Sequence, residues 1–334
     1  MDGISVIISY YNESGTIEKT LDLLAAQTFR PKEVLLINSS STDNSSQVIQ
    51  KWADRNSTRN NMVVRNINEG TNVPGSSMNV GIRNASCDLL AFMDCGLYFN
   101  PHWLESQMNY MLAHNSDVVL GLCLFGGTSL LDKSSIAQTS GYMRKRPTVP
   151  SSLVKKKVFE RTGLFQENKR SGHDVDWVRK LKRENIRKYV NESVVIKYME
   201  GNYGKSIKDI FLKTIRYAES TIALYKYYNH HIYGIFLTLS ILYIIKLVFF
   251  RPWPYNEYIP LYHIDKYWSE IIILFILFYV ALRGYIIPFL KSRNLNIFYE
   301  HPASIIILPI VGFIIDVGRI IGYVKGSFKY FTKS

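Results

Sequence analysis

The chain has 334 residues, of which 40 are basic and 27 acidic, and its formal net charge is +13. A hydrophobic content of 47% excludes a disordered chain, and the length suffices for one large or two modest domains. The basic excess lies before a hydrophobic C-terminal region, which favours contact with anionic lipid headgroups. Nucleic acid is not an expected partner, because no nucleic-acid-binding motif accompanies the short lysine runs.

The three cysteines, Cys87, Cys95 and Cys123, are isolated and show no CxxC spacing. They indicate neither a disulfide framework nor a zinc site, so we expect reduced thiols in a domain that faces the cytoplasm. The apolar run 4–8 is too short for the hydrophobic part of a signal peptide.

Strand-like and helix-like segments alternate in the first part of the chain. Residues 4–9 and 33–37 are predicted strands, and residues 15–26 carry apolar side chains at helical spacing. The alternation continues with a strand at 62–64, a helix at 78–84 and a strand at 89–93. This pattern predicts an α/β fold with a mostly parallel sheet flanked by helices.

Polar clusters follow three of these strands. They are Tyr11 to Glu13 after the first strand, Asn38 to Asp43 after the second, and Asp94 after the strand 89–93. Because ligands of such sheets bind beyond the carboxyl ends of the strands, we expect the three loops to converge on one site.

The C-terminal third is hydrophobic and is preceded by a basic amphipathic segment, 204–231. We expect this segment to lie in a membrane interface; a soluble helix packed on the rest of the protein is the alternative. Residues 232–250 and 271–290 are predicted membrane spans, since each is close to the roughly 20 residues that cross a bilayer. Arg283 lies inside the second span, where snorkelling to headgroups or clamping a lipid phosphate are the two interpretations.

A third hydrophobic segment, 304–324, carries Asp316 and Arg319 one helical turn apart. It is either a third span or an interfacial, re-entrant segment. An even number of crossings would place both the N-terminal domain and the basic C-terminus in the cytoplasm, which predicts a multi-pass protein of the cell membrane.

Several segments together carry a family resemblance. They are ISVIISYYNE (4–13), AQT (26–28), EVLLINSSSTD (33–43), LLAFMD (89–94), GLF (163–165) and SGHDVDW (171–177). In order and spacing they resemble family 2 glycosyltransferases of the GT-A fold, over roughly residues 3–200. The resemblance implies a catalytic domain over 1–203, with a nucleotide-sugar-binding half at about 1–125 and an acceptor half at about 126–203.

The resemblance implies transfer of a sugar from a nucleotide diphosphate donor with inversion at the anomeric carbon. Such a site must stabilise the charge of the leaving diphosphate and place a base beside the acceptor oxygen. Asp94 matches the first position of the family's D-x-D motif, whereas Gly96 stands at the third position. A Mg²⁺ or Mn²⁺ ion would then be held by Asp94 and the donor phosphates. Asp94 as a turn or helix-capping residue is the alternative.

Asp174 aligns with the aspartate of the family's Glu-Asp pair, with His173 in place of the glutamate. The resemblance therefore implies that Asp174 is the general base, with Asp176 as the second choice. From the residues alone, both acids would be ordinary first-turn residues favoured by a helix dipole.

The resemblance also implies a set of donor-binding residues. Those after the first two strands are Tyr10, Asn12, Glu13, Asn38, Ser39 and Asp43, of which Asp43 has a helix cap as its alternative role. Lys197 stands near the place where many relatives have a histidine beside the donor phosphates. It is a candidate point cation for those phosphates, or else a surface lysine.

Three functions are compatible with these features. The leading hypothesis is an inverting transferase that modifies a polyprenyl phosphate or a lipid-linked glycan at the cytoplasmic face. A processive polysaccharide synthase is the rival enzyme, although the sequence lacks the Q-x-x-R-W motif of such synthases. A non-catalytic scaffold that binds a sugar nucleotide is the third possibility, favoured by Gly96, His173 and Lys197.

Overall fold

The computed structural model describes residues 3–56, 62–68, 71, 73–167, 170–199, 206–222, 274 and 276–331. The chain divides into two compact units. Unit 1 comprises residues 1–136 and 142–202, and unit 2 comprises residues 137–141 and 203–334. The chain therefore enters unit 2 for five residues, returns to unit 1, and enters unit 2 again after residue 202.

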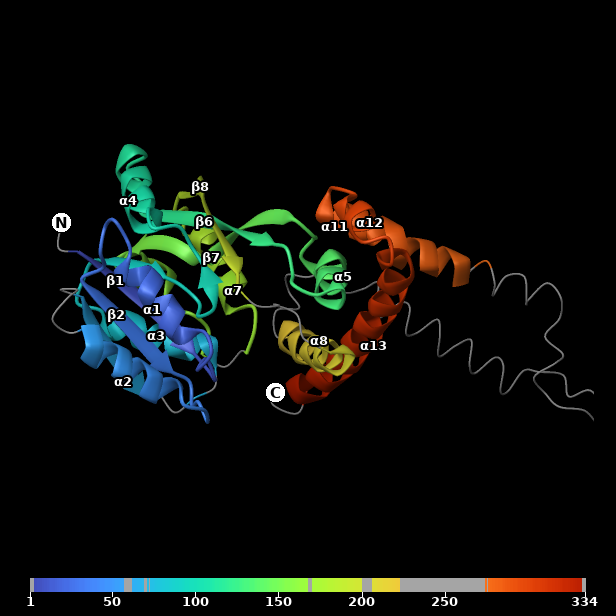
Figure 1. The fold of residues 1–334 in the computed structure, drawn as a ribbon, viewed down its shortest axis with the longest axis horizontal. Coiled ribbons are helices and arrows are strands. Elements are labelled where there is room, and N and C mark those ends of the chain that lie inside the picture. The colour runs from blue at the N-terminus through green and yellow to red at the C-terminus, as the bar shows by residue number, and fades with distance from the viewer. Residues whose placement is uncertain are drawn as a thin grey trace, which may run out of the picture. The chain divides into compact units, whose positions relative to one another are not determined.

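Unit 1 is built on an eight-stranded sheet with the order β3-β2-β1-β4-β7-β6-β8-β5 (Figure 1). The strands are β1 (Ile4–Tyr10), β2 (Glu33–Asn38), β3 (Val63–Asn68), β4 (Leu89–Phe92), β5 (Leu97–Tyr98), β6 (Val118–Phe125), β7 (Arg144–Lys155) and β8 (Lys188–Tyr198). The first four strands of the order pair in parallel, as the sequence predicts. β7 runs antiparallel to both β4 and β6, so the sheet is mixed.

The antiparallel strand β7 is the main departure from the predicted sheet. Pro147 and Pro150 interrupt its sequence and remove backbone donors, so the segment does not look like a strand. The structure accommodates them through a register shift between Val119 and Gly121 of β6. Because the pairing is irregular, β7 lacks the regular alternation of apolar and polar residues by which a strand is predicted from sequence.

Helices cover both faces of the sheet and enclose two hydrophobic cores. One core is formed with α1 (Ile17–Ala25), α2 (Ser45–Asn56) and α4 (Trp103–Ala113). The other is formed with α3 (Pro74–Asn84), α6 (Val158–Thr162) and α7 (His173–Arg183). Trp103 and Trp177 are fully buried in the first and second core, respectively. The three cysteines are free and buried, in agreement with the prediction of reduced core thiols.

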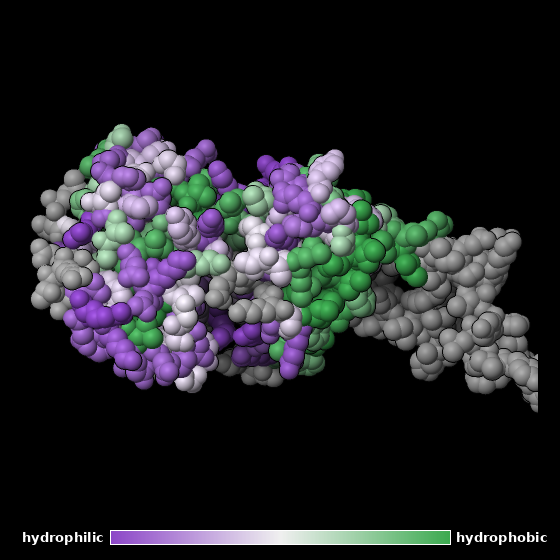
Figure 2. Space-filling model, viewed as in Figure 1, coloured by the Kyte–Doolittle hydropathy of each residue, from purple (hydrophilic) through white to green (hydrophobic). Residues whose placement is uncertain are grey.

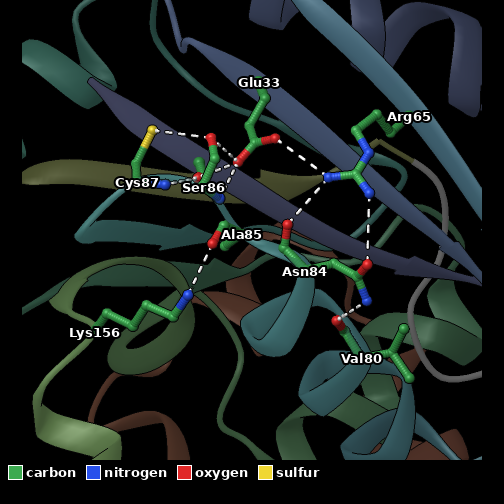
Figure 3. Close-up of polar contacts among 9 residues, drawn as sticks. Glu33, Arg65, Val80, Asn84, Ala85, Ser86, Cys87 and Lys156 are labelled. Carbon is green, nitrogen blue, oxygen red and sulfur yellow. Dashed lines mark hydrogen bonds and ion pairs between the residues drawn. The ribbon is translucent and has the colours of Figure 1, made fainter. Parts of the chain in front are cut away.

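A polar network joins the strand ends that lie away from the candidate loops (Figure 3). The buried Glu33 carboxylate accepts hydrogen bonds from Ser5 Oγ at 2.6 Å and from the Ser86 backbone N–H at 2.6 Å. Arg65 Nη1 lies 3.7 Å from the same carboxylate and donates to the Asn84 carbonyl at 3.0 Å. The network fixes the loop between α3 and β4 against β1 and β2, and so sets where β4 begins.

Unit 2 consists of helices. They are α8 (Ile207–Ile222), the π-helical turn η2 (Leu282–Ile286), α11 (Ile287–Ser292), α12 (Asn296–Glu300) and α13 (Ser304–Phe331). Residues 130–136 of α5 (Leu130–Thr139) belong to unit 1 and its last turn to unit 2. α8 packs closely on α13, because a Cβ at Gly322 would lie 2.4 Å from the Ile215 carbonyl oxygen. Small residues permit the same close approach between membrane helices.

Arg283 is 3% exposed and forms an ion pair with Asp316 of α13. It also donates to the Gly312 carbonyl at 3.1 Å, while Tyr279 Oη donates to Asp316 at 2.9 Å. Gln138, from the short inserted segment, donates to the Arg283 carbonyl. The structure thus corrects both interpretations of Arg283, since its side chain neither snorkels nor is open to a lipid phosphate.

Among the residues that the structure describes, one helix has the length and apolarity to cross a membrane, Ser304–Lys329, with a mean hydropathy of 2.2. The predicted span 232–250 lies outside the described residues. Of the predicted span 271–290, the described part is helical and includes η2. Several membrane spans are therefore not shown. Figure 2 shows a largely hydrophobic surface on this unit, to which Leu277, Phe278, Leu290, Ile306, Ile310 and Phe313 contribute.

Candidate active site

The loops after β1 and β2 are bound to each other by a set of short hydrogen bonds. Asn12, which adopts a φ of 56°, accepts from the Thr42 N–H at 2.8 Å, and its own N–H donates to Ser41 Oγ at 3.0 Å. Asparagine tolerates this left-handed conformation better than most residues. The loops expected to meet from the sequence therefore lie together at one edge of the sheet.

Asp43 holds the two loops together from the second side. Its carboxylate accepts from the Ser14 N–H at 3.0 Å and from Ser45 Oγ at 2.5 Å. Partial burial alone would raise the Asp43 pKa, but these hydrogen bonds lower it to about 2. The Glu13 N–H donates to Ser45 Oγ at 2.8 Å, so Ser45 connects the loop after β1, which carries Glu13, with the loop after β2, which carries Asp43. Asp43 also accepts from the Ser45 N–H at 3.1 Å, at the start of α2, which fits its alternative role as a helix cap.

The remaining candidates of the first two loops lie deeper. Tyr10 is 2% exposed, and its hydroxyl donates to Asn66 Oδ1 at 2.8 Å. Ser39 is buried and its hydroxyl pairs with Ser77 at 2.5 Å. Asn38 uses its amide to donate to Asn68 at 3.1 Å. Tyr10 and Ser39 thus shape the site from beneath it.

Asp94 lies in the turn between β4 and β5, and its carboxyl group is near two other acids. Burial, together with the negative charges of Asp174 and Glu13, raises its pKa to about 7. Asp94 and Asp174 are 80 residues apart in the sequence, in the turn after β4 and on α7, yet their charges interact. Asp94, Asp174 and Glu13 together concentrate negative charge in one region.

Asp174 and Asp176 occupy the first turn of α7 but differ in accessibility. Asp174 is partly exposed, whereas Asp176 is 7% exposed and its Oδ2 lies 3.8 Å from Lys180 Nζ. The neighbouring His173 is buried, which lowers its pKa, although Asp174 opposes the shift. Burial thus favours the neutral form of His173, and Asp174 is the more accessible of the two acids.

Two residues that the sequence analysis did not identify position the segment before α7. Asn79 of α3 donates to the Phe165 carbonyl and accepts from the Phe165 N–H, each at 2.9 Å. Gly75 leaves room for the same segment, because a Cβ there would lie 2.3 Å from the Gln166 carbonyl oxygen. A lone asparagine and glycine inside a helical pattern gave no signal of this role. Asn68, by contrast, could have been found, since it ends β3 at the same edge of the sheet.

The acidic cluster fits a divalent cation only in part. Asp94 offers one carboxylate, while Gly96 has no side chain and a φ of 72°. Glu13 is close enough to affect Asp94, and its carboxylate also accepts a hydrogen bond from Thr16. In the described part of the chain, no three His, Cys, Asp or Glu side chains are grouped as a metal site. A cation would relieve the repulsion among the acids, with oxygens of a bound substrate completing its ligands.

Lys197 lies near the end of β8, where it pairs with Tyr98 of β5. Its ammonium group lies over the Tyr98 ring, 5.2 Å from the centroid. The side chain lines a small pocket of about 40 Å³ with residues 124–127, Ile136 and Tyr198. The Met199 N–H donates to the Gly96 carbonyl at 2.8 Å, so the end of β8 is joined to the Asp94 turn.

Comparisons with known proteins agree with this architecture. The sequence profile of Glycosyl transferase family 2 matches residues 5–190. The glycosyltransferase AglE of Haloferax volcanii is 28% identical over 188 residues, 53% of this chain and 60% of that protein. The poly(ribitol-phosphate) beta-N-acetylglucosaminyltransferase TarS of Staphylococcus aureus is 33% identical over 119 residues, 35% of this chain and 20% of that protein.

A solved structure shows the same fold. The mannosyltransferase PcManGT of Pyrobaculum calidifontis, in complex with GDP-Man and Mn²⁺, aligns with a TM-score of 0.53 and 17% identity. The alignment covers 98% of this chain and 87% of that one. The curated relatives, in contrast, are matched over less than two thirds of their own length. Because the family profile covers more than half of the sequence, this chain belongs to glycosyl transferase family 2.

Proposed function

We propose that this chain is an inverting glycosyltransferase that transfers a sugar from a nucleotide diphosphate donor to a lipid acceptor, a polyprenyl phosphate or a lipid-linked glycan. The shared environment of Asp94 and Asp174 is the observation that carries the proposal. It supports a single site that contains both the acid expected beside the donor and the acid expected beside the acceptor. The product would contribute to a cell-surface glycan or a glycoprotein.

The donor would bind across the loops after β1 and β2. Asn12, Glu13 and Asp43 hold these loops together at the edge of the sheet. Asn38 lies at the end of β2, where its amide, held by Asn68 and Ser41, would support the nucleotide-binding edge. Tyr10 and Ser39 support this surface from below and would affect donor affinity through the shape of the loops.

Asp174 would act as the general base. An acceptor hydroxyl gives its proton to Asp174 as its oxygen attacks the anomeric carbon, and the nucleoside diphosphate leaves on the opposite side. The base is needed only for a hydroxyl acceptor, because a polyprenyl phosphate oxygen is already ionised. Asp174 lies in the first turn of α7 and is partly exposed, which supports its access to an acceptor.

A Mg²⁺ or Mn²⁺ ion, when bound, would neutralise charge on the leaving diphosphate. Asp94 would hold it from the turn after β4, with the donor phosphates as further ligands. Asp94 must lose its proton to do so, and its raised pKa shows that this ionisation is unfavourable without a nearby positive charge. Cation and donor would therefore bind together.

Unit 2 would bring the enzyme to its acceptor. α13 has the length and composition of a membrane helix, and the exposed apolar residues of η2 and α11 extend the hydrophobic surface. We propose a multi-pass arrangement in the cell membrane with unit 1 in the cytoplasm. The oligomeric state does not enter this proposal.

To test this function, membranes that contain the full chain are incubated with labelled nucleotide sugars and Mg²⁺ or Mn²⁺. The lipids are then extracted into an organic phase, and the label in that phase is measured. The proposal expects label in the lipid fraction with one donor and none with Asp174→Asn when the acceptor is a hydroxyl. Absence of lipid-linked label with every common donor would exclude it. A ladder of long products would instead identify a processive synthase, and donor binding without any product would identify a non-catalytic scaffold.

A further inference from the structure

Three strands of unit 1 bring two lysines to the same face of the sheet. Lys145 of β7 pairs with Leu124 of β6, and Leu124 pairs with Lys197 of β8. Directly paired residues project from the same side of a sheet. Neighbouring strands lie about 4.8 Å apart, so the two lysine Cα atoms are separated by about 10 Å, with Leu124 between them.

This end of the sheet is strongly basic. Both lysines are exposed, and Arg144 and Arg146 flank Lys145 on β7. The paired tips of the three strands, 122–125, 144–147 and 195–198, contain no acidic residue. Within the described residues, no carboxylate forms an ion pair with Lys145 or Lys197. A surface built from solvated lysines alone usually includes acids of opposite charge, and this one does not.

Local contacts limit the motion of Lys197. Its pairing with Tyr98 on β5 places the ammonium group over the tyrosine ring. Its side chain also forms one wall of the small pocket at residues 124–127. A cation held in this way loses less conformational entropy on binding an anion than a freely rotating lysine does.

We propose that Lys145 and Lys197 form a phosphate-binding site for the acceptor, so that the group receiving the sugar belongs to a substrate that also carries a phosphate or phosphodiester. This inference rests on the proposed function. Lysine ammonium groups bind phosphate oxygens as point charges, and Leu124 forms an apolar floor between them. The site would lie beside the Asp94 turn, to which β8 is joined through Met199 and Gly96.

The assignment revises the expected role of Lys197. The sequence resemblance placed it beside the donor phosphates, but its side chain lines the pocket at the end of β6 together with Leu124. Lys145 has the same face and the same neighbour, and nothing in the sequence pattern indicated it. The two lysines therefore lie as a pair on one face, and we assign the acceptor phosphate to that pair.

The phosphate could come from a lipid headgroup or from a polymer of polyol phosphate. Probes for the two sources are farnesyl phosphate and an oligomer of glycerol phosphate, with farnesol and an uncharged polyol as matched controls. Binding of each probe to the full chain in detergent is measured by calorimetry. The variants are Lys145→Gln, Lys197→Gln and, as a control, Lys188→Gln, an exposed lysine at the other end of β8.

The expected result is tight binding of one phosphate probe, weak binding of its uncharged partner, and about tenfold weaker binding for each of the first two variants. Lys188→Gln should bind like the unaltered chain. In the transfer assay, the acceptor KM should rise by a similar factor while the donor KM and kcat stay within about twofold. The better probe identifies the source of the phosphate.

Several results would overturn the inference. These are equal binding of charged and uncharged probes, an equal loss with Lys188→Gln, or a raised donor KM for Lys197→Gln with no effect of Lys145→Gln. The last result would return Lys197 to the donor. If phosphate binding depends on both lysines but no donor yields product, the site stands and the proposed function fails. If transfer occurs and is unaffected by either lysine, the function stands and this site fails.

Discussion

The guanidinium group of Arg283 lies 2.8 Å from the Asp316 carboxylate and joins η2 to the middle of α13. The pair is largely buried and satisfied by further hydrogen bonds from Tyr279 and to Gly312. An isolated charge in such surroundings is costly, whereas a paired and hydrogen-bonded one is tolerated. The two residues therefore depend on each other.

We predict that Asp316→Leu destabilises unit 2 by about 3–5 kcal/mol, because it leaves the buried Arg283 without a carboxylate partner. Arg283→Met should destabilise it less, because Arg319 still lies 3.7 Å from Asp316. The double variant should be markedly more stable than either single variant. Thermal unfolding of the detergent-solubilised protein checks this through a double-mutant cycle. Arg319→Met is the control, since Arg319 lies 3.7 Å from Asp316 and is more exposed. Additive losses in the double variant would contradict the prediction.

Asp174→Asn should reduce turnover by at least about 100-fold with a hydroxyl acceptor, since general bases typically contribute that much or more. Donor binding, measured by thermal shift, should not change. A smaller loss is expected with a polyprenyl phosphate, whose oxygen needs no base. Asp176→Asn is the comparison, and full activity of Asp174→Asn with both acceptors would remove this residue from its role.

Asp94→Asn should raise the melting temperature of the metal-free protein at pH 8 while abolishing cation-dependent activity. The folded-state pKa of about 7 lies above the ordinary value of 3.8, so folding disfavours the ionised carboxylate. This penalty is complete above pH 7 and disappears as the pH falls toward 4. The gain in melting temperature should therefore shrink over that range in EDTA. A gain that is independent of pH would mean that Asp94 titrates normally.

Glu33→Gln should destabilise unit 1 by about 1–3 kcal/mol at pH 7, because an amide cannot accept every hydrogen bond that this buried carboxylate receives. Burial opposes ionisation of Glu33, but the bonds from Ser5 and Ser86 lower its pKa below the usual 4.5. The stabilisation is present above pH 4.5 and is lost as the pH falls through the folded-state value. Urea unfolding at pH 7 and pH 3 tests this, with the exposed Glu192→Gln as a control. A difference from the unaltered chain that is as large at pH 3 as at pH 7 would contradict the prediction.

The features that could be predicted are those encoded locally. The strand-then-polar-loop pattern around Asn12 and Asp43 requires only short-range hydrophobic and turn signals, and the structure shows these loops in contact. Pairing Asp94 with Asp174 required the family resemblance, because 80 residues separate them and no local pattern relates them.

The features that escaped prediction depend on tertiary register. Lys145 and Lys197 become neighbours only through the strand order β7-β6-β8, in which two prolines obscure β7. The sequence relates Asp316 to Arg319, one helical turn away, and the structure has these two groups 3.7 Å apart. It also gives Asp316 a closer partner, Arg283, which lies 33 residues earlier and 2.8 Å away. A charged residue in an apolar segment predicts that an oppositely charged partner exists, but the sequence does not indicate which residue it is.

Residues 137–141 belong to unit 2 although the residues on both sides of them belong to unit 1, and this limits how the chain can be truncated or recombined. A truncation after residue 203 would leave Gln138 without the carbonyls of Arg283 and Leu308, to which it donates. It would also uncover Gly141, where a Cβ would lie 2.2 Å from the Lys291 carbonyl oxygen. Exchange of the C-terminal helices with those of a relative would therefore require two crossover points, with the inserted segment inherited along with the tail it contacts.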